Sequence, residues 1–291
     1  MIGSPLVIAE KARARLRAIL SGDVDLVESS AGLEITHLPD VADLLITACE
    51  VNTFHGTGTL LMRIFPDQSS MISLRTHNFY DSDQDFGQVK LSLPLAQSAR
   101  PEISAWLRWS MAGKTVRRIL CLPYTPAEAT VALAALDILG APLCTYIMDD
   151  KNVCADGISD DLMRELLEKS RLRLVIGPEM RDAYEQKYAM PFWVMPPVVA
   201  DRILKREVSP PPMARSPRCG VLLGNIWGQR WLDMLRQIFR DSGLTVDWYC
   251  NQINPPGLTY DRSELAEDGI LQRVPIAEDD LPSVLGNWNS L

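Results

Sequence analysis

Short apolar runs alternate with stretches of helical periodicity from residue 43 onwards. Buried strands are predicted at residues 43–48, 70–76, 119–123, 142–148, 172–176 and 192–196. Helices are predicted between most of them, at about 59–65, 103–111, 126–139, 160–169 and 180–188. This alternation is typical of βαβ units and predicts a parallel sheet. Residues 78–100 show no clear period and predict a long loop or an irregular insertion.

The best-defined helix of the pattern lies between the strands at 119–123 and 142–148. Thr125, Pro126 and Glu128 have the spacing of a capping box with proline in the first turn, and Gly140 is placed to end the helix. Ser159 is placed to cap the following helix. The helix between the strands at 119–123 and 142–148 therefore has sequence signals for both its start and its end.

The same strand-helix-strand pattern begins again after a proline-rich stretch. Strands are predicted at 219–225 and 244–250, with a helix between them that ends at Gly243. We therefore expect an N-terminal helical lead-in (1–40), a Rossmann-like domain (41–196), a linker (197–216) and a partial Rossmann-like domain (217–291). The lead-in is expected to be amphipathic. The second domain is expected to be truncated or unusually reduced.

Composition narrows the classes of protein that fit. The net charge of −8 disfavours a nucleic-acid partner, because a phosphate backbone would be repelled. Six scattered cysteines lack zinc-site spacing and are expected to be reduced, mostly buried thiols. The N-terminus lacks the apolar core of a signal peptide, and no apolar window is long enough to span a membrane. A cytoplasmic protein without a transmembrane segment is expected.

Two Rossmann-like domains joined by such a linker resemble the GT-B glycosyltransferases. The segment LRLVIGPEMRDAYEQKYAMPFWVMPPVV, residues 172–199, is similar to the passage that leads into the interdomain linker in the large family with sucrose synthase and bacterial mannosyltransferases. The resemblance covers roughly residues 40–260. It implies an α/β fold of two Rossmann-like domains of the GT-B type, the second incomplete.

A glycine-bearing loop, His55-Gly56-Thr57-Gly58, follows the first strand. In the family this loop lies at the interdomain cleft, so the resemblance implies contact with the sugar diphosphate or the acceptor. Two glycines at a helix start also permit close backbone approach to an anion. The alternatives are a tight strand-to-helix turn for the glycines and a polar loop residue without a task for His55.

Asp149 and Asp150 follow the strand at 142–148, at a carboxyl end of the sheet where open α/β folds place ligands. Many relatives have a His-Asp pair at this point, but Met148 stands where the histidine would be, so no catalytic histidine is carried over. The alternative is that the two acids belong to a helix N-terminus or a loop.

The segment GNIWGQRW, residues 224–231, resembles the family's Gly-Arg-Leu-x-x-x-Lys-Gly segment, whose two basic residues contact the donor diphosphate. Arg230 stands at the lysine position and Asn225 at the arginine position, with Gly224 as the first glycine. The alternatives are an N-cap for Asn225, a solvated helix position for Arg230 and simple packing for Trp227 and Trp231.

The resemblance implies transfer of a sugar from a nucleotide diphosphate sugar to a carbohydrate or other hydroxyl acceptor. It implies no cofactor and no metal, because Arg230 and helix dipoles would stabilise the departing diphosphate. The family's paired glutamates fall later than Leu291. We therefore expect weak turnover by this chain, and a protein partner that completes the second domain. The alternatives are a noncatalytic α/β interaction module or remnant, or another nucleotide-binding α/β enzyme such as a dehydrogenase or epimerase.

Overall fold

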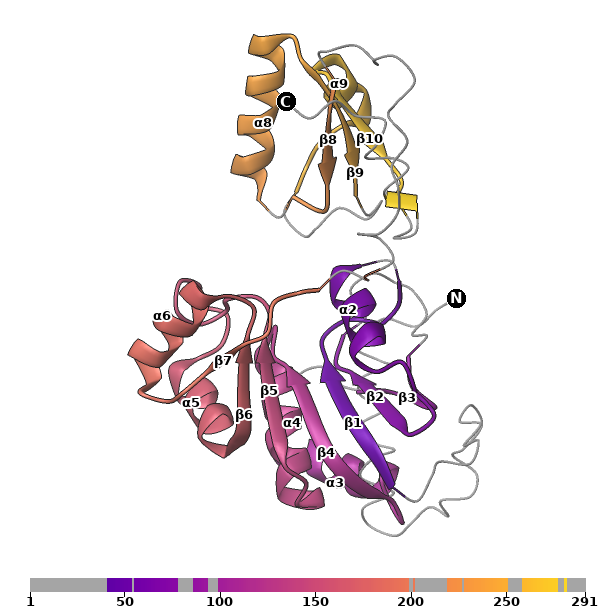
Figure 1. Cartoon of the computed structure of the whole chain (residues 1–291), viewed down its shortest axis with the longest axis vertical. Coiled ribbons are helices and arrows are strands. Elements are labelled where there is room, and N and C mark those ends of the chain that lie inside the picture. Colours follow the sequence, from indigo (N-terminus) through magenta and orange to yellow (C-terminus); the bar gives the residue numbers. More distant parts are fainter. Residues whose placement is uncertain are drawn as a thin grey trace. The chain divides into compact units, whose positions relative to one another are not determined.

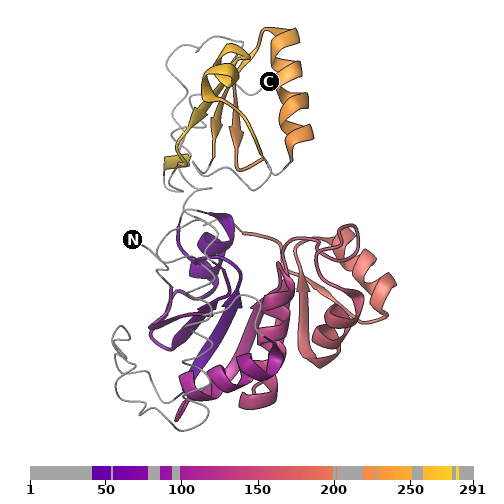
Figure 2. The same cartoon turned by 180° about the vertical axis from the view of Figure 1, so that it is seen from behind.

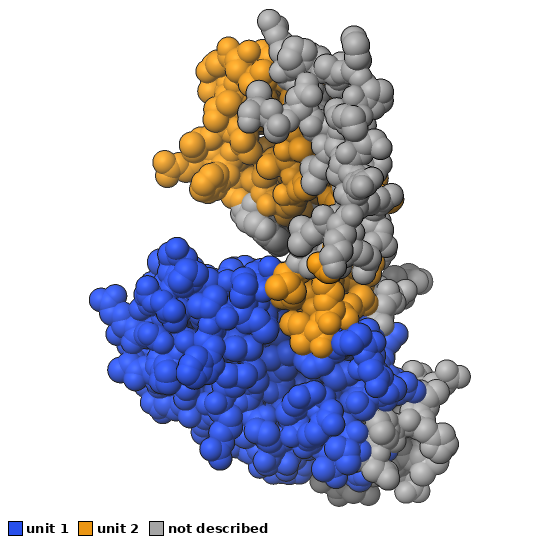
Figure 3. All heavy atoms as spheres, viewed as in Figure 1, with its two compact units in different colours: residues 1–51, 65–197 blue, residues 52–64, 198–291 orange. Residues whose placement is uncertain are grey.

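The computed structural model describes residues 41–53, 55–77, 86–93, 99–198, 201, 219–226, 228–250, 258–276 and 280–281. The chain divides into two compact units (Figure 3). Unit 1 comprises residues 1–51 and 65–197, and unit 2 comprises residues 52–64 and 198–291. The predicted lead-in and nearly all of the predicted linker lie outside the described residues. The exact domain boundaries stay a prediction.

Unit 1 is built on a seven-stranded sheet in the order β3-β2-β1-β4-β5-β6-β7 (Figure 1). Every strand pair in it is parallel, which confirms the predicted sheet. The strands are β1 Val41–Thr47, β2 Met71–Arg75, β3 Val89–Ser92, β4 Thr115–Leu122, β5 Leu143–Ile147, β6 Ser170–Val175 and β7 Trp193–Val194. All seven therefore have their carboxyl ends at one edge, where the loops that follow them begin.

Four helices accompany this sheet: α3 Arg100–Ser110, α4 Pro126–Leu139, α5 Asp160–Lys169 and α6 Pro178–Tyr188. The main core packs between these helices and one sheet face, with residues such as Ile46, Ile119, Leu133 and Leu167 almost fully buried. Helix α4 lies centrally in this layer, and seven of its fourteen residues are buried. Its low amphipathicity follows from that central place, because neighbours surround it on several sides.

The predicted caps of α4 are confirmed. The Thr125 hydroxyl oxygen accepts a hydrogen bond from the Ala127 backbone N–H at 3.2 Å, and Gly140 ends the helix with a φ of 63°. The prediction for α5 was only half right. Ser159 occupies the N-cap position, but its side chain makes no capping hydrogen bond.

Strand β3 lies in the range that showed no clear period. Only four residues long, it alternates a buried Leu91 with exposed neighbours and pairs with β2 from Val89 to Ser92. A strand this short carries too few positions for a reliable period-2 signal. Tertiary pairing with β2, rather than local pattern, therefore defines it. Residues 78–85 and 94–98 of this range lie outside the described residues.

Unit 2 contains a second parallel sheet in the order β10-β9-β8. Its elements are α2 Gly56–Ile64, β8 Cys219–Leu223, α8 Gln229–Ser242, β9 Thr245–Tyr249, α9 Arg262–Glu267 and β10 Ile270–Arg273. A small core forms around Leu232, Trp248 and Leu265. The strand predicted at 219–225 thus begins a sheet separate from the first. Helix α2, expected in the first domain, is grouped with unit 2.

The described cysteines are free thiols. Cys49, Cys121 and Cys250 are buried, Cys144 is half-buried and Cys154 is exposed. Burial raises the pKa of Cys49 to about 12 and that of Cys144 to about 11, so both are poor nucleophiles at neutral pH. Within the described part of the chain, no helix has the length and apolar character that a membrane crossing requires.

Candidate functional site

The loop predicted from the glycine motif forms the first turn of α2. The backbone N–H of Gly58 donates to Nδ1 of His55 at 3.2 Å, so the imidazole satisfies one of the helix's free N–H groups. The backbone N–H and hydroxyl of Thr59 both donate to the His55 carbonyl, at 3.1 and 3.2 Å. His55 therefore has a structural task as a helix cap. A contact of His55 with a substrate stays a prediction.

The two glycines of this turn differ in what surrounds them. A Cβ on Gly58 would lie 2.0 Å from the carbonyl oxygen of Asn52, closer than any real contact, so only glycine fits there. A Cβ on Gly56 would meet nothing within 4 Å, and Gly56 is exposed. The tight-turn explanation thus accounts for Gly58. It does not account for Gly56, which leaves Gly56 and Thr57 as the positions where backbone could approach a ligand.

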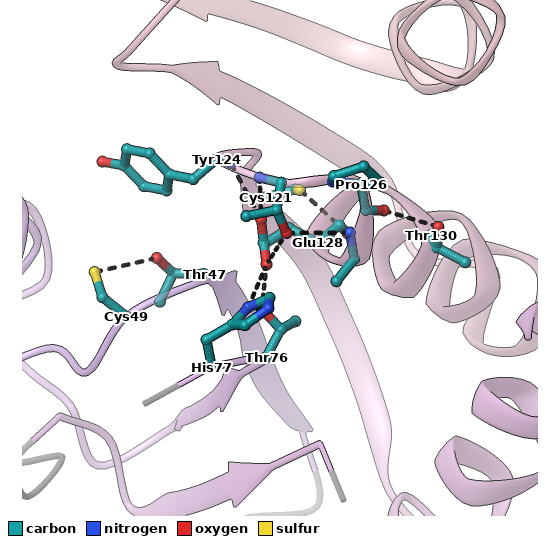
Figure 4. Close-up of polar contacts among 11 residues, drawn as sticks. Thr47, Cys49, Thr76, His77, Cys121, Tyr124, Pro126, Glu128 and Thr130 are labelled. Atoms are coloured by element: carbon teal, nitrogen blue, oxygen red, sulfur yellow. Dashed lines mark hydrogen bonds and ion pairs between the residues drawn. The ribbon is translucent and has the colours of Figure 1, made fainter. Parts of the chain in front are cut away.

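A polar cluster that the sequence did not predict lies at the carboxyl edge of the unit 1 sheet (Figure 4). Its centre is Glu128, whose side chain is completely buried at the start of α4. One carboxylate oxygen accepts hydrogen bonds from the backbone N–H groups of Thr125 at 2.6 Å and Tyr124 at 3.1 Å. The other accepts from the Thr76 hydroxyl and lies 3.6 Å from His77 Nδ1.

The hydrogen bonds of this cluster define the state of the His77 ring. The Thr76 hydroxyl gives its one hydrogen to the Glu128 carboxylate, which can only accept. The Thr76 oxygen, 2.8 Å from His77 Nδ1, must then accept from an Nδ1–H group. In neutral His77 this arrangement makes Nε2 the basic nitrogen. The His77 side chain is 33% exposed, so a solute can reach the ring.

Backbone pairing holds His77 in place. The N–H groups of Thr76 and His77 donate to the carbonyls of Thr47 and Ala48, both at 3.0 Å, which extends the pairing of β2 with β1 beyond the strand ends. Glu128 comes from the first turn of α4, the helix that follows β4, and β4 is the other neighbour of β1. The cluster thus joins residues 52 positions apart in sequence. A histidine directly after a predicted strand was the one sequence signal that could have pointed to it.

The same edge continues across β5. The Tyr124 hydroxyl donates to Sδ of Met148 at 3.6 Å, which connects the ends of β4 and β5. On the other side, buried Glu50 follows β1 and lies 3.4 Å from Nη1 of Arg75 at the end of β2. Charged and polar side chains therefore follow four adjacent strands at one edge, the position at which parallel α/β sheets bind ligands.

The two predicted acids after β5 have different surroundings. Asp149 is exposed, and Asp150 is half-buried. Asp150 accepts hydrogen bonds from the N–H groups of Asn152 (3.0 Å), Val153 (2.8 Å) and Cys154 (2.6 Å) and from the Tyr184 hydroxyl (3.1 Å). Burial alone would raise the pKa of Asp150, but these hydrogen bonds outweigh burial and lower it. Asp150 therefore organises its loop, and Asp149 is the acid that remains accessible.

Removing the Asp150 carboxylate should destabilise unit 1. We expect Asp150→Ala to lower the free energy of unfolding at neutral pH by about 2 kcal/mol, because three backbone N–H groups and the Tyr184 hydroxyl lose a charged acceptor. Since the folded-state pKa of Asp150 is lowered, its contribution exists above the unfolded pKa and is lost as the pH falls. The gap between variant and parent should therefore narrow towards about pH 3.

Urea denaturation at several pH values measures this gap. Asp149→Ala is the matched control, because the neighbouring carboxylate is exposed, and it should change stability by no more than about 0.5 kcal/mol. Equal losses in the two variants would show that the four hydrogen bonds of Asp150 do not stabilise the loop.

The predicted donor-side residues of unit 2 lie in the loop after β8 (Gly224 and Asn225) and in the first turn of α8 (Arg230). Gly224 has a φ of 105°, a left-handed conformation that favours glycine, and its carbonyl accepts a hydrogen bond from the Trp248 indole N–H at 2.7 Å. Arg230 is exposed in the first turn of α8. It is thus available for a phosphate, and a role in binding one stays a prediction.

Two alternatives for this segment were wrong. The residue at the N-cap position of α8 is Gly228, not Asn225, so helix capping does not explain Asn225. Trp231 is 69% exposed, so it does not pack into the core. Trp227 lies outside the described residues. Among the residues described, no group of His, Cys, Asp or Glu could hold a metal ion, and the need for a metal remains untested.

Comparison with known proteins supports the fold. No protein-family model matches the sequence, and no curated protein matches it. A solved UDP-N-acetylglucosamine 2-epimerase from Rickettsia bellii covers 83% of this chain with 71% of its own length, at 11% identity and a TM-score of 0.51. The structural neighbours are GT-B folds, so the chain has an α/β fold of the GT-B, Rossmann-like type.

Two glycosyltransferases are also among the similar structures. An alpha-glucosyltransferase in complex with UDP and a 13-mer DNA has a TM-score of 0.46 at 10% identity, with 84% of this chain and 69% of that chain covered. A ugt transferase from Siraitia grosvenorii in complex with UDP has a TM-score of 0.44 at 13% identity, with 82% and 72% covered.

Proposed function

We propose that the protein binds a nucleotide diphosphate sugar and transfers the sugar to a hydroxyl acceptor. The observation that carries the proposal is the Glu128-Thr76-His77 cluster at the carboxyl edge of the first sheet of a GT-B fold. Such an edge is where these sheets take ligands. An accessible imidazole whose tautomer is set by a buried carboxylate is the kind of group that accepts a proton from a hydroxyl.

In this proposal the acceptor hydroxyl gives its proton to Nε2 of His77 as its oxygen bonds to the anomeric carbon of the sugar. The bond from that carbon to the diphosphate oxygen breaks, and the nucleoside diphosphate leaves. Glu128, through Thr76, stabilises the imidazolium that forms. Asp149 is an accessible carboxylate on the same edge that could orient the acceptor.

The donor diphosphate is assigned to backbone and charge rather than to a metal. Arg230 in the first turn of α8, together with the N-terminal end of that helix dipole, favours an anion near Gly224 and Asn225. The open surroundings of Gly56 and Thr57 at the start of α2 support a similar approach of backbone to ligand. The proposal needs no cofactor other than the donor substrate.

Calorimetry with UDP, GDP and NAD tests the proposal first. We expect UDP or GDP to bind and NAD not to bind, because neither glycine loop is a full dinucleotide-binding motif. Gly56→Ala should weaken nucleotide binding without loss of stability. Incubation with UDP-N-acetylglucosamine and analysis for its C2 epimer would identify epimerase chemistry instead. Absence of binding to either nucleotide would contradict the proposal.

The role of His77 is tested by nucleotide release from a panel of UDP- and GDP-sugars. Turnover by the parent chain is expected to be weak, so the assay must follow slow release. We expect His77→Gln to lower kcat by about 100-fold or more and to leave nucleotide binding unchanged. Thr76→Val should lower kcat by a smaller factor than His77→Gln, because the His77 ring that accepts the proton remains. Parent-like turnover by His77→Gln would remove His77 from the mechanism.

One observation favours a noncatalytic interaction module as a second candidate. Trp231, Met234 and Ile238 lie at positions i, i+3 and i+7 of α8 and are 69%, 51% and 53% exposed. Side chains with this spacing form one stripe along a helix. An exposed apolar stripe of this kind supports a protein partner for unit 2. Size-exclusion chromatography with light scattering, together with the nucleotide calorimetry, separates the two candidates.

A further inference from the structure

The outer side of helix α8 in unit 2 carries a row of exposed apolar side chains. Trp231, Met234 and Ile238 are 69%, 51% and 53% exposed. In the part of the chain that the structure describes, no other helix has more than one large apolar side chain that is exposed. Single exposed apolar residues are normal on a protein surface, but a contiguous row of them marks a contact surface. We call these three residues the α8 stripe.

The opposite side of α8 is the side that covers the sheet of unit 2. Leu232 is fully buried in the core there, and Leu235 and Phe239 pack against that core. Figure 1 and Figure 2 show the strands and α9 of unit 2 on one side of α8 only. A helix that only covers a sheet needs one apolar face. Helix α8 has a second one, the α8 stripe, which no described element of unit 2 covers.

Two exposed charged residues, Arg230 and Asp241, flank the α8 stripe on one and the same side. They are eleven residues apart, so on a helical projection they lie within about 20° of each other, at opposite ends of the helix. Among the described residues, Arg230 has no hydrogen bond or ion pair, and the first turn of α8 has no acidic residue. A cation at a helix N-terminus opposes the helix dipole, so Arg230 would be stabilised by an anionic group from another molecule.

An antiparallel pair of α8 helices brings these charges together. About a two-fold axis perpendicular to both helices, the same side of each copy meets the same side of the other. With the axis midway between Arg230 and Asp241, each arginine lies beside the aspartate of the second copy. Met234 then lies within about 1.5 Å, along the helix, of Ile238 in the second copy, so the two stripes meet. A parallel pair would instead gather both arginines at one end and both aspartates at the other.

From these observations we propose that α8 is the contact surface of a homodimer, in which two α8 stripes pack antiparallel and Arg230 of each copy pairs with Asp241 of the other. The inference rests on the second candidate function, because it names the protein partner of the stripe, and it does not depend on the chemistry of the candidate site. The stripe is only about 10 Å long, so we expect a weak dimer that forms with increasing protein concentration. Trp231 is the kind of large side chain that dominates such contacts.

Sedimentation velocity of the full-length chain at several concentrations, without nucleotide, measures the dimer. We expect the parent to dimerise and Met234→Lys to raise the Kd of the dimer by about 100-fold or more, because a charge then lies in the middle of the contact. Asp233→Arg is the control, because Asp233 is exposed on α8 but lies away from the stripe. It should leave the Kd unchanged. Circular dichroism should show that both variants are folded, since both positions are exposed.

Reversal of the ion pair tests the antiparallel arrangement. Asp241→Arg alone should raise the Kd of the dimer by about tenfold, because arginines then meet at both ends of the contact. The double variant Arg230→Asp, Asp241→Arg restores opposite charges at both ends. Its Kd should return to within about threefold of the parent value.

Three results would overturn the homodimer. A parent chain that is monomeric at every concentration would exclude a second copy and would leave a different protein as the partner of the stripe. A dimer that persists in Met234→Lys would place the contact on another surface. An equal loss in Asp241→Arg and Asp233→Arg, or no recovery in the double variant, would refute the pairing of Arg230 with Asp241.

Discussion

Gly58→Ala should lower the free energy of unfolding by about 3 kcal/mol or more. The new Cβ would lie 2.0 Å from the Asn52 carbonyl oxygen and 2.7 Å from the Asn52 nitrogen. Both are backbone atoms, which cannot move away as the end of a flexible side chain can. Overpacking that forces a backbone shift costs at least 1–3 kcal/mol, roughly, and this contact is unusually close. Chemical denaturation monitored by circular dichroism measures the loss.

Gly56→Ala is the matched control, two residues earlier in the same helix. Its Cβ would point into open space, and Gly56 is not among the glycines with positive φ. Alanine there should leave stability unchanged or raise it by up to about 1 kcal/mol, because it restricts the unfolded chain. If both variants lost the same stability, the close approach of Asn52 would not be the cause.

Glu128→Ala should be the second strongly destabilising change, again by about 3 kcal/mol or more. The substitution removes the acceptor for two backbone N–H groups and for the Thr76 hydroxyl. Each buried donor left without a partner costs about 1–3 kcal/mol, and the truncated side chain also leaves a cavity. The midpoint of thermal or urea unfolding reports the effect.

Two variants separate the contributions of Glu128. Glu128→Gln keeps the shape, and a glutamine can still serve a capping box, so we expect a loss of only about 1 kcal/mol. Glu102→Ala is the control on α3, where Glu102 accepts from the Ala99 backbone N–H at 3.3 Å but is only half-buried. It should cost no more than about 1 kcal/mol. A loss as large as that of Glu128→Ala would show that burial of the carboxylate is not what matters.

Most of the fold could be predicted because local signals agreed with each other. The capping box at Thr125 and Glu128, the closing Gly140 and the apolar strands on either side all pointed to one β-α-β unit. Strand β3 could not be predicted, because four residues with a single buried side chain carry little pattern. The grouping of α2 with unit 2 also depends on tertiary contacts that no local pattern contains.

The candidate site was predicted less well, for a physical reason. Glu128 was identified from its spacing to Thr125 as a capping residue, and the structure confirms that task. Its contact with Thr76 and His77 arises only when β2 and β4 flank β1, so sequence spacing cannot show it. Asp150, by contrast, looked like a ligand residue from its place after β5, but it accepts three hydrogen bonds from its own loop and one from Tyr184 on α6, so it organises that loop.

The hydrogen bond from Trp248 to Gly224 has an optical consequence. The indole of Trp248 is almost fully buried, and its N–H donates to a carbonyl in the loop assigned to the donor phosphate. A ligand that shifts this loop changes the polarity around the indole, and therefore its emission wavelength, without any label. Trp231 on the same unit and Trp193 on unit 1 are exposed, so iodide quenches their emission in preference to that of Trp248. Titrations with and without iodide can thus separate the signal of the buried indole from that of the exposed ones.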